Sequence, residues 1–475
     1  MEQGRNKKLI NDILIYGAGA IGAKFITYFL YPIYTFFIAP DDLGYYDITL
    51  TAVFFLMPAI NLQLRSGVFR FLIDNKDENS RKAVINQSYR MMIAATAVVS
   101  VLFVIIPFFA DIRCYSYIFG LLLSMSFYEV QIQIVRGLGH TKLYVVCGIL
   151  SASFIFLFGI LFVVFLKWNI EGIFLAYIIA QLLVICFIEI KLSVIRKYFS
   201  LKTKNKDVTK ELLKYCGPLI IVSSFIWITS YSYRYFITYN MGLYANGLFA
   251  AAFKFATIIE IIAMTVFQAW QEMSVLQFNA KDKDKYYSSV LNSYLLFLTS
   301  AVITLSFILK SFYGKFVEVE YGSSVIYLYA LCIAEIGYAL QAFMSAIFHA
   351  QKNTMQILYV TLASAVVSLF SYYVFIKYMG LMGAAVGFGI SFFFMFAYYM
   401  ILIRKSIKIS FSAKHLITSV IILVGGGFIF YATENVWWRI IYWMISIITL
   451  YRTLPKSILH EAKTRIAGKL SDFRK

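Results

Sequence analysis

Apolar segments long enough to cross a lipid bilayer recur along this chain from its first tens of residues to its last. A bilayer core about 30 Å thick requires about 20 apolar residues of helix, because a backbone in lipid must satisfy its hydrogen bonds within the segment. Hydrophobic residues make up 61% of the 475 residues and charged residues only 14%, which is too little charge for a soluble protein of this length. The sequence therefore predicts an all-α, polytopic membrane protein.

Windows of about 20 apolar residues predict about 14 transmembrane helices. They are expected near residues 13–38, 45–64, 91–110, 115–136, 143–166, 171–190, 215–239, 244–269, 287–309, 324–349, 355–376, 381–403, 414–432 and 436–452. The first segment is too long for the apolar core of a signal peptide, and no small-residue cleavage site follows it. We therefore expect it to remain in the protein as a span.

The basic residues of the loops predict the orientation of these spans. With Met1 inside, 34 of the 43 Lys and Arg residues fall in inner segments, six in outer segments and three within spans. Cytoplasmic loops of membrane proteins carry such an excess, so both termini are expected in the cytoplasm. The net charge of +19 is dispersed over these loops, and it therefore does not indicate nucleic-acid binding.

Three pairs of short segments indicate an internal duplication. The pairs are "APDDLGYYDI" with "GLYANGLFAA", "GLGHTKLY" with "HAQKNTMQ", and "VFLKWNIEG" with "VFIKYMGLMG", in the same order and 203 to 212 residues apart. A repeat of six spans gives two lobes of like orientation, which is a transporter plan with a central cavity. The expected domains are an N-terminal lobe (1–200), a C-terminal lobe (201–408), two extra spans (409–453) and a basic cytoplasmic tail (454–475).

Charged residues inside the expected spans are the candidates for a functional site. Lys24, Arg234 and Lys254 lie within apolar segments, where a charge costs about 3 kcal/mol or more unless it faces protein or water. One interpretation is a hydrated, electropositive cleft that binds an anionic substrate. The other is intramembrane ion pairing, for instance of Lys254 with Glu335. For the three bases taken together, from both halves, the sequence favours the cleft.

Acidic residues form a second set of candidates. Asp47, Glu129, Glu260 and Glu335 are expected to pair with these bases or to carry a coupling ion, H⁺ or Na⁺. The five cysteines are scattered without a CxxC pair, and the four histidines lie far apart, so we expect no disulfide framework and no metal site. The triple glycine at 425–427 lies in an apolar span and is expected to allow close helix packing.

The central segment of the chain resembles a known family. "LLKYCGPLIIVSSFIWITSYSYRYFI", followed by "GLFAAAFKFATIIE" and "FQAWQ", is similar to the signature of the polysaccharide transporter family, the Wzx-type O-antigen flippases. "GVFRFL" and "VRGLGHTKLY" resemble the family's inner loops, and the likeness extends over about residues 10–405. Arg234 and Lys254 match the family's arginine and lysine, whereas Tyr233 stands where the family commonly has Asp, which leaves Arg234 without its adjacent acid.

This resemblance implies a member of the multidrug/oligosaccharidyl-lipid/polysaccharide exporter superfamily in a bacterial cytoplasmic membrane. It implies no enzyme and no cofactor, but a flippase for an undecaprenyl-pyrophosphate-linked oligosaccharide. Its partners would be membrane lipids, a glycan polymerase and glycosyltransferases. In lipid II flippases, spans like the two extra ones help to form a groove for the lipid tail. The alternatives are a drug/cation antiporter, which should prefer acidic residues in its cleft, and a membrane glycan polymerase or ligase, which needs a larger outer loop.

Overall fold

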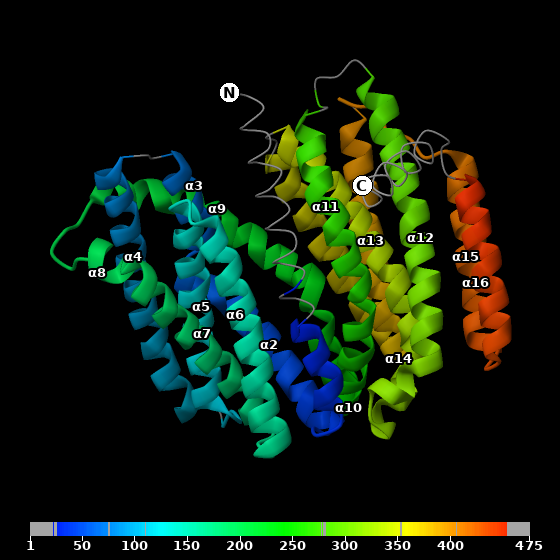
Figure 1. Cartoon of the computed structure of the whole chain (residues 1–475), viewed down its shortest axis with the longest axis horizontal. Coiled ribbons are helices and arrows are strands. Elements are labelled where there is room, and N and C mark those ends of the chain that lie inside the picture. The colour runs from blue at the N-terminus through cyan, green and yellow to red at the C-terminus, as the bar shows by residue number, and fades with distance from the viewer. Residues whose placement is uncertain are drawn as a thin grey trace, which may run out of the picture. The chain divides into compact units, whose positions relative to one another are not determined.

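A computed structural model describes residues 22, 26–74, 77–109, 111–276, 278, 282–351, 354–404 and 406–453, and every regular element in these ranges is a helix (Figure 1). Ten helical stretches of the described residues are long and apolar enough to cross a membrane. The prediction of an all-α polytopic membrane protein is therefore confirmed. The chain packs into two compact units, residues 1–251 and 252–475.

From residue 26 onward, where the continuous description of the first unit starts, a helical stretch covers residues 26–35. Its further elements are α2 (Pro40–Asn61), α3 (Leu64–Asp74), α4 (Glu78–Ile105), the 3-10 turn η1 (Ile106–Phe108), α5 (Tyr115–Gly137), α6 (Thr141–Gly159), the π-helical η2 (Ile160–Phe165), α7 (Ile170–Leu192), α8 (Val194–Tyr198), α9 (Lys206–Tyr231) and most of α10 (Tyr233–Ala256). α5 lies against α2, α3 and α7, and α9 packs on α2, α3 and α4.

The second unit contains the end of α10 and the remaining helices. These are α11 (Ile258–Leu276), α12 (Lys283–Phe316), the 3-10 segment η3 (Val319–Ser324), α13 (Val325–Ala350), α14 (Thr354–Ile403), α15 (Ala413–Ala432) and α16 (Val436–Thr453). α13 packs on α11 and α14, while α15 and α16 pack side by side on α12 (Figure 1).

The expected spans from the second to the last each coincide with helix in this structure, and the first is described only at residue 22 and from residue 26 onward. α10 and α14 each cover the junction of two expected spans. Their backbones turn at Gly242, with φ of 85°, and at Gly380, with φ of 57°. Only glycine adopts such dihedral angles without strain, so these residues mark the two turns between spans. The six-span lobes and the cytoplasmic position of the termini stay predictions.

The backbones of α2 and of the second half of α10 meet at two glycines, both within the first unit. A Cβ atom at Gly44 would lie 2.1 Å from the carbonyl oxygen of Leu243, and one at Gly247 would lie 1.9 Å from the carbonyl oxygen of Pro40. Gly44 and Gly247 are 203 residues apart, and so are Pro40 and Leu243. Two copies of one segment exchange equivalent contacts in this way about a two-fold axis, so the contact supports the duplication.

The loop that precedes α5 is tied to the beginning of α2. Arg113 forms an ion pair with Asp42, and its other terminal nitrogen lies 3.9 Å from Glu171 at the start of α7. The hydrogen bond to Asp42 raises the pKa of the Arg113 guanidinium. Asn169 also donates a hydrogen bond to Asp42. These contacts hold the ends of α2, α5 and α7 together, and thereby position the helices that carry the site.

The triple glycine lies in α15, where it lets three helices approach closely. A Cβ atom at Gly425 would lie 2.3 Å from the Tyr442 hydroxyl of α16, and one at Gly426 would lie 2.3 Å from Ile303 of α12. A Cβ atom at Gly427 would contact Tyr329 of α13 at 3.1 Å. The predicted role of these glycines in close helix packing is therefore confirmed.

Candidate functional site

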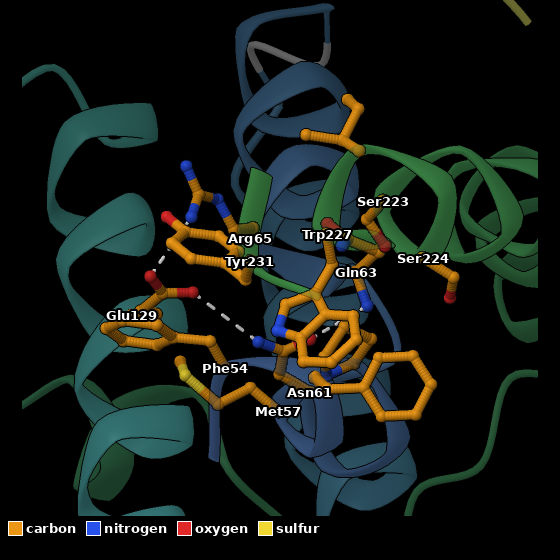
Figure 2. A pocket seen from close by; sticks show the side chains of 13 residues that line it. Phe54, Met57, Asn61, Gln63, Arg65, Glu129, Ser223, Ser224, Trp227 and Tyr231 are labelled. Atoms are coloured by element: carbon orange, nitrogen blue, oxygen red, sulfur yellow. Dashed lines mark hydrogen bonds and ion pairs between the residues drawn. The ribbon is translucent and has the colours of Figure 1, made fainter. Parts of the chain in front are cut away.

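A polar pocket of about 300 Å³ lies inside the first unit, between α2, α3, α5 and α9 (Figure 2). Its lining combines one basic and one acidic side chain with amides, hydroxyls and aromatic rings. The lining residues are Phe54, Phe55, Met57, Pro58, Asn61, Gln63, Arg65, Glu129, Ser223, Ser224, Ile226, Trp227 and Tyr231. Figure 2 shows Arg65 and Glu129 facing each other on one side of the pocket and Ser223 and Ser224 on the opposite side.

A break between α2 and α3 places Asn61 and Arg65 at the pocket. Leu62 and Gln63 both adopt left-handed conformations, with φ of 48° and 54°, which non-glycine residues adopt at an energetic cost. The backbone N–H of Gln63 donates to Asn61 Oδ1 at 2.9 Å, and the N–H of Leu62 donates to the carbonyl of Pro58. The helix axis therefore breaks here, and such strained backbone is commonly found at functional sites.

The two charges of the pocket form an accessible ion pair. Arg65 Nη1 lies 3.0 Å from Glu129 Oε1, with 49% of the arginine side chain and 29% of the glutamate side chain exposed. Asn61 Nδ2 lies 3.5 Å from the other carboxylate oxygen of Glu129. Exposed pairs of this kind contribute about 0–1 kcal/mol, because water competes for both groups. The pair positions Arg65, and it can break at little energetic cost.

Aromatic rings from α2 and α9 form another part of the lining. The Trp227 ring lies 4.7 Å from that of Phe55, and Tyr231 lies 6.1 Å from Phe54. Trp227 Nε1 donates to the carbonyl oxygen of Thr51 at 2.7 Å, which fixes the indole across the two helices. Flat rings beside amides and hydroxyls suit a carbohydrate, whose C–H faces are apolar and whose edges form hydrogen bonds.

A side-chain cap fixes the beginning of α9, and two serines of this helix bond to its own backbone. Asn205 caps the helix, and its Oδ1 accepts hydrogen bonds from the N–H groups of Asp207 and Val208. Such a cap satisfies backbone donors that a helix start leaves unpaired. Ser223 and Ser224 donate their hydroxyls to the carbonyl of Ile220.

Arg234 is held in a second ion pair, formed with Asp47 of α2. Arg234 Nε lies 2.6 Å from Asp47 Oδ2, and only 7% and 13% of the two side chains are exposed. Asn246 Nδ2 lies 3.5 Å from the same carboxylate oxygen and 2.9 Å from the carbonyl oxygen of Gly44. The ring of Tyr233 lies 4.6 Å from the guanidinium. Asp47 thus forms an ion pair with Arg234 although the neighbouring residue, Tyr233, is not acidic.

Three of the other predicted site residues lie in the second unit, on α10, α11 and α13. Lys254 is half-buried in α10, Glu260 is half-buried in α11, and Glu335 of α13 is 2% exposed. All three belong to the second unit, and Lys24 lies outside the described residues. Substrate-binding roles of Lys24, Arg234 and Lys254 stay predictions, as do coupling roles of the four acids. The structure joins Asp47 to Arg234 and brings Glu129 into the pocket.

Sequence reasoning did not select Arg65 as a site residue. It lies just beyond the second expected span (45–64), four residues after Asn61 and therefore at the spacing of one helix face. Its spacing from Asn61 was the available signal, whereas its acidic partner lies 64 residues away on α5.

The second unit contains an apolar groove of about 500 Å³. Residues of α13, α14 and α15 form it: Tyr329, Ala330, Ile333, Met382, Val420, Leu423, Val424, Gly427 and Tyr431. The lining is apolar apart from its tyrosine hydroxyls, so this groove suits a hydrocarbon chain.

The fold defines a class, the multi-pass helical membrane proteins. Residues 9–271 match the family described as polysaccharide biosynthesis protein, and the chain belongs to this family. No curated protein sequence matches the chain.

Solved structures share its fold at low sequence identity. The lipid II flippase MurJ in an inward closed conformation has a TM-score of 0.73 and 16% identity, covering 96% of this chain and 100% of that chain. An inward-facing multidrug resistance MATE family transporter of the MOP superfamily has a TM-score of 0.67 and 15% identity, covering 80% of this chain and 95% of that one. A MOP superfamily transporter from Pyrococcus furiosus, described as having a binding pocket of reverse polarity, has a TM-score of 0.62 and 15% identity, covering 83% and 95%.

Proposed function

We propose that this protein is a flippase that moves a polyprenyl-pyrophosphate-linked oligosaccharide, a repeat unit of O-antigen or another surface polysaccharide, across a bacterial cytoplasmic membrane. The polar pocket carries the proposal, because it combines an accessible guanidinium with aromatic rings and neutral hydrogen-bonding groups. Arginine offers charge-assisted, bidentate hydrogen bonds to a phosphate, and the rings and amides suit the first sugars. The polysaccharide biosynthesis family supports the same substrate class.

The position of the pocket fits loading from the cytoplasm. It lies where α2 ends and α3 begins, which is the inner end of the second span if both termini are cytoplasmic. In this conformation the buried pair with Asp47 engages Arg234, whereas the Arg65 side chain is half exposed. We therefore assign the first phosphate contact to Arg65, with Lys24, Arg234 and Lys254 as candidates for later contacts.

The polyprenyl tail of the substrate would stay in apolar surroundings throughout transport. The groove of the second unit, lined by α13, α14 and α15, offers it a surface of suitable chemistry. In the cell, glycosyltransferases would supply the substrate and a polymerase would consume it, while H⁺ or Na⁺ is the candidate coupling ion. Transport of this kind requires rearrangement of the protein and no covalent catalysis by its residues.

The experiment is a surface-glycan assay in a host that lacks its own copy of the gene. Arg65→Ala should reduce glycan export at least about tenfold, because charge-assisted bonds to a phosphate are worth about 1.5–3 kcal/mol. Arg70→Ala provides a matched control, because Arg70 lies on the same helix and pairs with Asp74 at an exposed position outside the pocket. Equal export by both variants at equal protein levels contradicts the proposal.

A drug/cation antiporter is the alternative that the shared fold with MATE transporters favours. Glu129 would be its cation-binding acid. Because Arg65 neutralises Glu129 in the same pocket, the site suits an organic cation less well than a phosphate. Drug resistance that depends on Glu129, with unchanged surface glycan, would establish the antiporter instead.

A further inference from the structure

The pocket holds its own carboxylate at the point where a phosphate would meet Arg65. We propose that Glu129 is a displaceable counter-ion, which positions Arg65 and yields its place to the pyrophosphate of the substrate. This inference rests on the proposed function, and it names the residue that sets how tightly the pocket holds its ligand.

The geometry of the pair allows such an exchange. The described residues provide Arg65 with one ion-pair contact, from Nη1 to Glu129 Oε1 at 3.0 Å. The guanidinium therefore keeps donors for a second anion, and half of the side chain is exposed. A pyrophosphate carries more negative charge than a carboxylate and accepts two parallel hydrogen bonds, so it competes favourably for the guanidinium.

Glu129 has a second partner that can hold it after the exchange. Asn61 Nδ2 lies 3.5 Å from Glu129 Oε2, on the carboxylate oxygen that Arg65 does not contact. A small approach would make this contact a good hydrogen bond, because amide donors favour distances near 2.9 Å. Arg65 and Glu129 are the charged residues among those lining the pocket. The exchange therefore involves this one ion pair, because the other lining groups carry no charge.

Glu129 has two opposing effects on transport in this scheme. Its negative charge weakens phosphate binding, because the ligand must first replace it. The same charge helps the ligand to leave, because Glu129 reclaims Arg65. Neutralising Glu129 should therefore tighten binding and slow turnover, a combination that a purely structural role does not produce.

The test is calorimetric titration of the purified full-length protein in detergent with farnesyl pyrophosphate and, separately, inorganic pyrophosphate. Glu129→Gln should tighten binding of farnesyl pyrophosphate about five-fold, which corresponds to the upper value of an exposed ion pair. Asp74→Asn is the control, because it removes an equal charge from an exposed pair on α3 and should leave binding unchanged. A similar gain with inorganic pyrophosphate assigns recognition to the phosphate head, and a gain confined to the farnesyl compound assigns it to the lipid-linked form.

The two proposals fail in different ways. If Arg65→Ala weakens binding but Glu129→Gln does not tighten it, the displacement proposal is wrong and the pocket remains the binding site. If Arg65→Ala leaves binding of both probes unchanged, the assignment of the pocket in the proposed function is wrong. Glu129→Ala provides a second variant should the glutamine variant fold poorly, and the same gain in affinity is expected from it.

Discussion

Two ion pairs in the first unit use the same chemical groups in different surroundings. Arg234 and Asp47 meet in a nearly dry site beside the contact of α2 with α10, whereas Arg65 and Glu129 meet inside an accessible pocket. Breaking a buried pair leaves an uncompensated charge, while water replaces either partner of an exposed pair at little cost. Arg234–Asp47 is therefore suited to hold helices, and Arg65–Glu129 to exchange partners.

Removing the acid of the buried pair gives the largest expected effect. Asp47→Ala should lower the free energy of unfolding by about 3–5 kcal/mol, because it removes one partner of a buried ion pair. Thermal unfolding of the purified protein in detergent measures this loss, with Glu129→Ala as the comparison. The contrast between the pairs is wrong if the two variants unfold at the same temperature.

The glycine contact beside the buried pair gives the next largest effect. Gly44→Ala and Gly247→Ala should each cost about 1–3 kcal/mol, because the new methyl group would overlap a backbone carbonyl that cannot rotate away. Gly148→Ala in α6 is the control, since no heavy atom would lie within 4 Å of its Cβ. A stability loss for Gly148→Ala as large as for the other two would contradict this explanation.

The indole of Trp227 links the two regions, because it lines the pocket and bonds to Thr51 of α2. Trp227→Phe removes the 2.7 Å hydrogen bond to the Thr51 carbonyl but keeps a ring in the pocket. The expected loss of stability is about 1 kcal/mol, with surface glycan reduced less than by Arg65→Ala. A reduction in glycan equal to that of Arg65→Ala would assign the indole a larger role than packing and orientation.

Neutralising the acid of the pocket gives the smallest expected change in stability. Glu129→Gln should shift the free energy of unfolding by less than about 1 kcal/mol, because its ion pair is partly exposed and the amide can still bond to Asn61. Thermal unfolding beside Asp74→Asn measures the difference. A loss comparable to that of Asp47→Ala would show that the pocket pair also holds the fold.

The spans were predictable because lipid imposes one strong pattern on sequence. Length and hydropathy located the described helices. The break at Leu62 and Gln63 was not predictable, since neither residue type favours left-handed backbone. Pairing also escaped prediction, because Arg234 and Asp47 are 187 residues apart and Arg65 and Glu129 are 64 apart. Helical spacing predicts which residues share a face of a helix. Tertiary packing decides which charged residues of different helices form pairs.

The exchange of contacts between Gly44 and Gly247 has a consequence for the origin of the chain. A parallel homodimer of the six-span half would make both contacts with a single glycine, so an ancestor of half this length could have dimerised through one small residue. The glycine is the one identical residue in these two ten-residue segments; among the differing positions, Asp47 corresponds to Ala250, and Asn246 corresponds to Leu43. These polar residues now lie 3.5 Å apart across the contact. The charge of Asp47 is therefore present on one side of this contact alone, whereas a symmetric dimer of the half would bury it twice.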